Sequence, residues 1–327
     1  MPRVAITDIM RETGLSRATV DRALNARGKV HARTQELVRE TLQRLKARPA
    51  AETSRPAADI VLRVGRGLME HLRAAWGEAA DGRFVDLHQG REGDVLAALA
   101  DLCADVSRPL IVTVKNTDAI VSKLAEARSN GKRVVALVSD LAPAARDAFV
   151  GVDDRAAGQT AAFVIGRALG DRPISVGVVV GDGAFRCHED REIGFRTALR
   201  AHFPKVALSG EAAGEDNPAL TREAVAGLLR EQPALAAIYN VGGGNRGLVE
   251  ALEACGRGGD VLVVAHETNA VTAPLLRDNR IAFALAADPG AQLRAALRAA
   301  TNPDHGGECL DFGVYTRFNL PAFAPRA

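Results

Sequence analysis

From residue 59 onward, short apolar runs alternate with longer stretches in which apolar residues recur at helical spacing. The continuous apolar runs predict strands that are buried on both faces. These strands cover residues 60–64, 83–87, 110–114, 134–138, 149–152, 175–180, 236–241, 261–265 and 281–286. The expected helices cover residues 68–78, 95–105, 118–131, 155–169, 191–203, 221–231, 246–256 and 271–279. Strands joined by helices in this order predict an α/β body with parallel sheets and right-handed crossovers.

Residues 1–48 have a different pattern, which predicts three short amphipathic helices. Thr7 is expected to cap the first helix and Ser16 the second, because their hydroxyls can accept from free N–H groups of a first turn. Gly14 supplies the turn between these two helices, and residues 33–46 form the third. This arrangement predicts an all-α helix-turn-helix unit whose second helix is free to enter a DNA groove.

Composition and charge refine this division. Hydrophobic residues make up 47% of the 327 positions and aromatic residues only 4%, so the core is expected to be aliphatic. The net charge is +2, but residues 1–56 carry twelve lysines and arginines against six acidic residues. The remaining residues carry 30 against 34. The basic excess therefore lies in the N-terminal segment, where it favours a polyanionic partner.

The sequence contains no motif that indicates catalysis, a metal or a cofactor. Its four cysteines are far apart and lack the spacing of zinc ligands, so we expect reduced thiols. His188 and Asp190 could form a base and its orienting acid, but no nucleophile motif accompanies them. The first residues lack a signal peptide, and no run approaches the ~20 apolar residues of a membrane span. We therefore expect a cytoplasmic non-enzyme with no membrane partner.

The N-terminal segment carries a dense set of family-specific positions. They are Val4, Thr7, Asp8, Ile9, Gly14, Leu15, Ser16, Thr19, Val20, Arg22, Leu24, Asn25, Val30, Thr34 and Leu45. At these positions the segment resembles the lac repressor family of bacterial regulators. The resemblance implies that Arg17, Ala18 and Arg22 meet base edges of an operator. It further implies DNA-backbone contacts and positioning by Thr7, Ser16, Thr19, Asn25, His31 and Thr34.

Residues 49–58 depart from that family. Pro49 stands where the family has a proline, but no leucine follows before Ile60. The family's leucine wedges into the minor groove from a short helix, so the segment is expected to be a linker or an atypical hinge.

The body, residues 59–327, resembles the periplasmic sugar-binding protein fold in the order of its units. That resemblance implies an N-lobe of about residues 59–156 and 287–312, and a C-lobe of about 157–286 and 313–327. Arg191 stands three residues before a Gly-Phe pair, where the family has an arginine that grips a ligand hydroxyl or carboxylate. The candidate effector-binding residues are Arg66, Asp140, Phe185, His188, Arg191, Tyr239, Asn245 and Glu267.

These features together predict a lac-repressor-type regulator, expected to act as a repressor, that binds double-stranded operator DNA as a homodimer. Its affinity for the operator is expected to be controlled by a small sugar or polyol bound between the two lobes. One alternative is the same regulator with an acidic metabolite, met by Arg66 and Arg191. The others are a solute-binding protein for a transporter and an enzyme fused to a DNA-binding segment.

Overall fold

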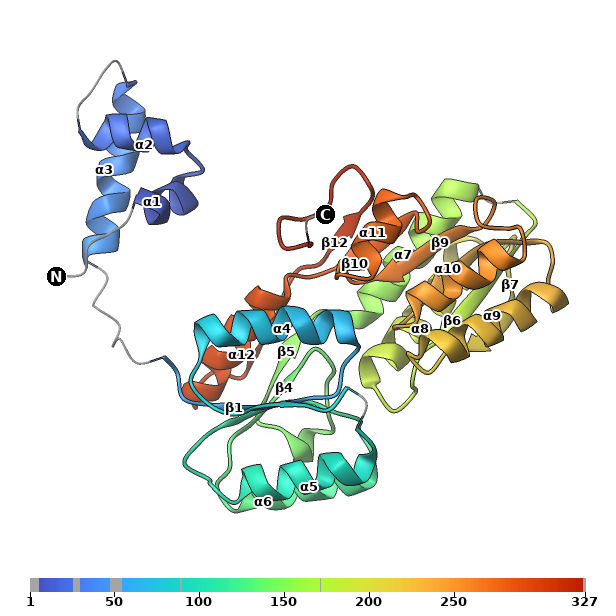
Figure 1. Cartoon of the computed structure of the whole chain (residues 1–327), viewed down its shortest axis with the longest axis horizontal. Coiled ribbons are helices and arrows are strands. Elements are labelled where there is room, and N and C mark those ends of the chain that lie inside the picture. The colour runs from blue at the N-terminus through green and yellow to red at the C-terminus, as the bar shows by residue number, and fades with distance from the viewer. Residues whose placement is uncertain (1–5, 26–29, 48–54, 89, 171, 326–327) are drawn as a thin grey trace. The chain divides into compact units, whose positions relative to one another are not determined.

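The computed structural model describes residues 6–25, 30–47, 55–88, 90–170 and 172–325, and divides the chain into two units, residues 1–55 and 56–327 (Figure 1). The first unit contains the helices α1 (Ile6–Thr13), α2 (Arg17–Leu24) and α3 (Ala32–Ala47). Ile9, Val20 and Val38 form its small core. Three short helices with one buried stripe each can share such a core without strands.

The two predicted helix caps have different outcomes. Ser16 is the N-cap of α2, as expected, and its Oγ accepts a hydrogen bond of 3.3 Å from the Thr19 N–H. The prediction that Thr7 caps the first helix is wrong, because α1 begins one residue earlier, at Ile6, and Thr7 is helical. The predicted hinge at 49–58 falls mostly outside the described residues, where nothing tests it. Its last residues are extended, and Ala57 pairs with Asp81.

In the second unit, the first sheet has the strand order β11-β5-β4-β3-β1-β2, and all its pairings are parallel. Its strands are β1 (Asp59–Leu62), β2 (Phe84–Asp86), β3 (Leu110–Thr113), β4 (Val134–Leu137), β5 (Ala148–Gly151) and β11 (Gly307–Cys309). Its helices are α4 (Arg66–Ala79), α5 (Glu92–Cys103), α6 (Asp118–Ser129) and α12 (Pro289–Thr301), with a short 3-10 turn at Pro143–Ala145. This sheet and its helices form the N-lobe.

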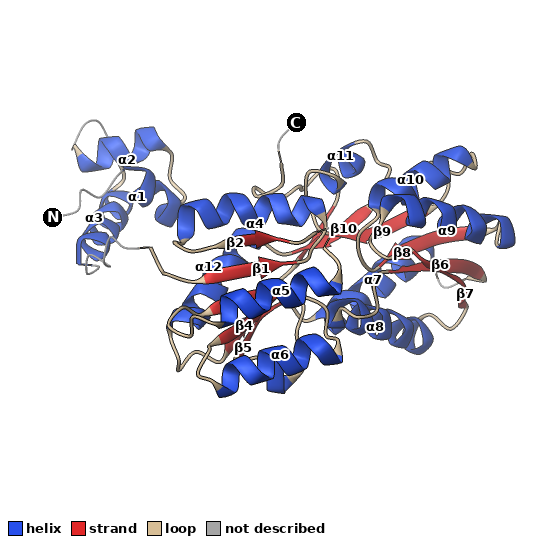
Figure 2. Ribbon diagram, turned by 60° about the horizontal axis from the view of Figure 1, so that its bottom comes forward, coloured by secondary structure: helices blue, strands red, loops and turns tan. Residues whose placement is uncertain are grey.

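The second sheet has the order β12-β10-β9-β8-β6-β7, with only β12 antiparallel to its neighbour. Its strands are β6 (Ile174–Val180), β7 (Val206–Ala213), β8 (Leu235–Asn240), β9 (Leu262–His266), β10 (Phe283–Ala286) and β12 (Gly313–Tyr315). The helices are α7 (Asp154–Leu169), α8 (Arg186–His202), α9 (Pro218–Glu231), α10 (Asn245–Ala254) and α11 (Thr272–Arg277). They form the C-lobe, and Figure 2 shows the strands of both lobes sandwiched between helices.

The chain passes between the two sheets three times: from β5 into α7, from β10 into α12, and from β11 into β12. The predicted α/β body with two lobes and parallel sheets is confirmed. Two edge strands, β7 and β11, and the helix α12 were not among the predicted elements. The helix α8 begins at Arg186, five residues before the expected start at residue 191, so it includes His188.

Two glycines allow α7 and α8 to pack unusually closely. A Cβ at Gly158 would stand 1.9 Å from the Arg191 carbonyl oxygen, and one at Gly194 would stand 2.2 Å from that of Arg155. Both contacts are with backbone, which cannot turn aside as a flexible side chain could. The close approach puts the first turn of α7 against the middle of α8. Beside it, the Phe195 ring packs 4.5 Å from that of Tyr239, measured between centroids.

We expect Phe195→Ala to destabilise the second unit by about 3–5 kcal/mol, because Phe195 is fully buried and its removal leaves a cavity in the core. Phe318→Ala is the matched control. Its ring is 90% exposed, so its change should stay within about 0.5 kcal/mol. Chemical denaturation of both variants measures the difference. Equal stabilities would contradict the placement of Phe195 in the core.

Candidate functional site

The carboxyl ends of the strands in both lobes border a shared cavity. The N-lobe contributes residues from α4, the end of β4 and α12, and the C-lobe contributes residues from α8 and from the segment after β9. The polar lining residues are His71, Arg191, His266, Glu267, Thr268, Asn269 and Gln292. Apolar side chains such as Leu68, Val138 and Phe312 complete the wall. A cavity with an apolar wall and a few converging polar groups is typical of a small-molecule site.

Arg191 is held in place by two contacts within the C-lobe. Its Nε donates to Asp154 Oδ1 at 2.7 Å, and its Nη1 donates to the Val241 carbonyl oxygen at 3.0 Å. Burial disfavours its positive charge, but the Asp154 carboxylate outweighs that cost and raises the pKa of Arg191. The guanidinium is therefore a fixed cation with donors left over, because it has five N–H groups in all.

Tyr239 and His266 form a neutral buried pair. The Tyr239 hydroxyl lies 2.7 Å from His266 Nε2, and burial lowers the pKa of the imidazole and raises that of the phenol. The neutral imidazole can accept a hydrogen bond from the phenol hydroxyl. The expectation that Tyr239 binds the effector needs correction, because its side chain has no exposed surface. The ring belongs to the core, and His266 is the member of the pair that reaches the cavity.

Glu267 and Thr268 present polar groups with spare hydrogen-bonding capacity to the cavity. Burial raises the pKa of Glu267, although Asn269 Nδ2 donates to its Oε2 at 2.6 Å and opposes the shift. Thr268 is 3% exposed, and its hydroxyl finds no partner within the described part of the chain. An unpaired buried hydroxyl costs free energy, so it marks a place where a bound molecule or water would complete the bonding.

The backbone at the cavity is strained at equivalent points of the two lobes. Val138, after β4, and Glu267, after β9, both have φ of 67°. A β-branched residue such as Val138 rarely adopts this left-handed conformation. Both residues line the cavity. Strain of this kind persists only where the surrounding structure holds it, and it gathers at ligand sites.

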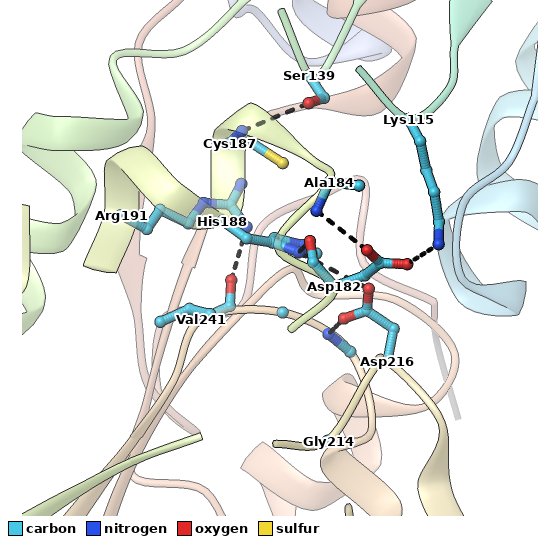
Figure 3. A network of polar contacts seen from close by, with 12 residues as sticks. Lys115, Ser139, Asp182, Ala184, Cys187, His188, Arg191, Gly214, Asp216 and Val241 are labelled. Carbon is cyan, nitrogen blue, oxygen red and sulfur yellow. Dashed lines mark hydrogen bonds and ion pairs between the residues drawn. The ribbon is translucent and has the colours of Figure 1, made fainter. Parts of the chain in front are cut away.

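A second polar network joins the two lobes nearby (Figure 3). The Asp182 carboxylate, after β6 in the C-lobe, forms ion pairs with two N-lobe cations: Lys115 after β3, and Arg63 after β1, whose Nη1 is 3.7 Å away. Burial would raise the pKa of Asp182, but Lys115, the Ala184 N–H and Arg63 together lower it. The Asn116 N–H also donates to the Ala184 carbonyl across the lobes at 2.8 Å.

His188 lies between this network and Arg191 on α8. Its Nδ1 is 3.1 Å from the Asp182 carbonyl oxygen and 3.7 Å from Asp216 Oδ2. Burial favours the neutral ring, but the neighbouring Cys187 and Asp216 outweigh it and raise the pKa of His188 to about 9. The imidazole is therefore protonated at neutral pH.

The other sequence-predicted effector residues are dispersed. Arg66 is exposed in the first turn of α4 and does not line the cavity. Asp140 forms an ion pair with Arg146 inside the N-lobe. Asn245 is buried and bonded to Asn240 and Thr272, so the amide of this candidate residue is used within the protein. Phe185 is nearly buried, with its ring 5.7 Å from that of His188.

The predicted DNA-contacting residues lie in the first unit: Thr7 in α1, and the others around α2 and at the start of α3. Exposed among them are Ser16, Arg17, Ala18, Arg22, Asn25 and His31, whereas Thr19 and Thr34 are half-buried. The side chain of Thr7 lies outside the described residues. Arg22 Nε donates to the Ala18 carbonyl at 3.0 Å along the helix.

Sequence reasoning missed Arg63, Lys115 and Asp182. Each follows directly, or within two residues, the end of an apolar strand. The rule that ligands bind beyond the carboxyl ends of parallel strands points to all three positions.

The described residues contain no group of three or more histidine, cysteine or acidic side chains that could hold a metal. The four cysteines are free thiols. Among the described helices, none combines the length and the apolar character that crossing a bilayer requires.

Two lobes around a shared cavity, linked by three crossings, define the fold of a periplasmic-binding-type protein. Residues 107–302 match the family model of the periplasmic binding protein domain. Since this match spans more than half of the sequence, the chain belongs to that family. No curated protein matches the chain.

Several solved structures have the same fold. A solute-binding protein of an ABC transporter from Burkholderia graminis, in complex with D-arabinose, is 18% identical with a TM-score of 0.75, over 84% of this chain and 99% of that one. A glucose-galactose binding protein from Geobacillus stearothermophilus is 18% identical with a TM-score of 0.71, over 81% and 99%. A periplasmic solute-binding protein from Actinobacillus succinogenes with bound D-allose is 16% identical with a TM-score of 0.70, over 81% and 99%.

These comparisons contradict the expected function. The similar structures are sugar- or solute-binding proteins, which favours the solute-binding alternative over a DNA-binding transcriptional repressor. The expected cytoplasmic location is contradicted as well, because the family and these proteins point to the periplasm or the cell exterior. The three helices of the first unit do not by themselves establish DNA binding, because one fold can serve unrelated functions.

We predict a stability that depends on the charge of His188. The pKa of His188 in the folded protein, about 9, lies above the ordinary 6.5. The stabilisation from its protonated imidazole is therefore fully present below pH 6.5 and is lost as the pH rises through 9. Its size is on the order of 3 kcal/mol.

Asp216→Asn should lower the pKa of His188 and move this loss to lower pH, as measured by NMR titration of the imidazole and by unfolding at several pH values. Asp260→Asn, at an exposed site, is the control. An imidazole that titrates near 6.5 in the unmodified protein would refute the assignment.

Proposed function

We propose that this protein binds a small sugar or polyol between its two lobes, in the manner of a solute-binding protein. The observation that carries the proposal is the cavity shared by both lobes, where a buried hydroxyl of Thr268 has no partner within the described residues. Sugars offer closely spaced hydroxyls that both donate and accept, which suits such a wall. The D-arabinose and D-allose bound to two of the similar structures support this class of ligand.

The cavity wall supplies complementary partners. Arg191 provides fixed donors, since Asp154 and Val241 hold its position. Glu267, with its raised pKa, can accept from one hydroxyl and, when protonated, donate to another. Apolar residues such as Leu68 and Phe312 can contact the C–H faces of a ring. Because these residues come from both lobes, a ligand that touches them all stabilises the closed arrangement.

The direct test is isothermal titration calorimetry of the full chain with a panel of pentoses, hexoses and alditols, supported by thermal unfolding. We expect at least one sugar to bind with a dissociation constant in the micromolar range or below. Binding should raise the unfolding temperature, because a ligand bound only to the folded state stabilises it. The absence of binding across the whole panel would refute the proposal.

Thr268→Val tests the cavity wall. Valine keeps the shape of threonine without its hydroxyl, so the free protein should be as stable as before or more stable, because an unpaired buried group is removed. Affinity for the sugar found in the panel should fall roughly three- to tenfold, which corresponds to the net free energy of one hydrogen bond.

Thr221→Val is the matched control. Thr221 is equally buried, but its hydroxyl donates to the Gly214 carbonyl at 3.2 Å, away from the cavity. This variant should lose stability and keep its sugar affinity. If Thr268→Val lost stability and left binding untouched, its hydroxyl would have a structural role only.

A further inference from the structure

We infer that Arg63 and Lys115 form an anion subsite of the ligand cleft, occupied in this structure by the protein's own Asp182, and that the ligand is a sugar that carries a carboxylate. This inference rests on the proposed function, because it specifies the class of sugar that the same cleft takes.

The geometry of the cations is the first step. Arg63 and Lys115 come from the ends of two neighbouring N-lobe strands and converge on one carboxylate from the other lobe. Their side chains are 25% exposed and that of Asp182 is 18% exposed, so the group is shielded but still reached by solvent. Within the described residues, no other carboxylate is paired with either cation. Two positive charges against one negative charge leave an excess that a ligand anion can use.

Arg63 is positioned by contacts other than this ion pair. Its Nε donates to the Gly90 carbonyl at 3.1 Å, and its guanidinium lies over the Phe185 ring, 5.8 Å from the centroid. The cation therefore keeps its place when Asp182 moves away. A planar guanidinium and a lysine ammonium side by side suit a carboxylate, which can accept from both.

The subsite is connected to the cavity by His188 and Arg191. His188 Nδ1 contacts the Asp182 carbonyl, and Arg191, one helical turn further along α8, lines the cavity (Figure 3). Both residues are cations, and each has a carboxylate partner: Asp216 for His188 and Asp154 for Arg191. Arg191 is the weaker carboxylate partner, because its charge is already paired with Asp154, and its remaining N–H groups suit sugar hydroxyls.

Exchange of one carboxylate for another is the proposed binding step. The ligand carboxylate takes the place of the Asp182 side chain, which turns toward solvent, and the ion pairs with Arg63 and Lys115 are preserved. No covalent bond changes. A neutral sugar has no group to make this exchange, so the cleft discriminates by charge as well as by hydroxyl pattern.

The experiment is isothermal titration calorimetry of the full chain with two matched pairs, D-galacturonate against D-galactose and D-glucuronate against D-glucose, with D-glucose 6-phosphate as a third kind of anion. We expect at least one uronate to bind roughly tenfold or more tightly than its neutral partner, since a hydrogen-bonded charge pair is stronger than a neutral hydrogen bond. Its affinity should weaken with added salt.

Variants identify the residues. Lys115→Met should weaken uronate binding by about tenfold more than it weakens binding of the neutral partner. Lys123→Met, at a half-buried lysine paired with Glu126 in the same lobe, is the control and should change neither. Asp182→Asn should strengthen uronate binding, because it removes the internal competitor. If Asp182 were instead a ligand for sugar hydroxyls, the same change would weaken binding of every sugar.

The outcomes separate the two proposals. Neutral sugars that bind while both uronates fail would overturn the acidic class and leave the proposed function in place. Tighter binding of the sugar phosphate than of either uronate would also overturn the carboxylate assignment. Failure of every sugar would overturn both. The comparison of uronates with neutral sugars on the unmodified chain decides the class even if a variant does not fold.

Discussion

The buried ion pair between Arg191 and Asp154 is the interaction on which the site depends. Removing either partner would leave an uncompensated charge inside the C-lobe, at a cost of several kcal/mol. The pair requires α7 and α8 to approach within backbone contact, which Gly158 and Gly194 permit. Asp154 begins α7 directly after the chain has crossed from the N-lobe, so the pair ties the crossing point to the cavity wall.

The apolar pattern predicted the body well because a strand covered on both faces has no alternative to a continuous apolar run. The edge strand β7 was not predicted, because it lacks such a run. It is paired on one side only, and its sequence of small and polar residues leaves most of its side chains half-buried or exposed. The N-terminal helices were likewise found from their apolar spacing. That spacing reports a small core around Val20, and a core of this kind says nothing about what its outer face binds.

The site was predicted only in part, because side-chain direction and pairing across lobes are not properties of local sequence. Tyr239 and Glu267 both lie at strand ends, yet the first packs into the core and the second faces the cavity. Residues that follow strands could have been proposed by rule, Arg63 and Lys115 included. Their shared partner could not, since Asp182 follows a strand of the other sheet and pairing between sheets is not visible in local sequence.

The ion pairs of Asp182 with Arg63 and Lys115 form a bridge between the two lobes. The bridge through Asp182 already connects the lobes, so a bound molecule gains only what it contributes beyond that bridge. A neutral sugar must either fit beside the intact bridge or break it and leave two cations without a partner. An acidic sugar replaces the bridging carboxylate and adds its hydroxyls to the wall formed by Arg191 and Thr268. A ligand therefore competes with the Asp182 carboxylate for Arg63 and Lys115. Only a ligand with its own anionic group can replace Asp182 without losing the ion pairs, so this competition selects acidic sugars over neutral ones.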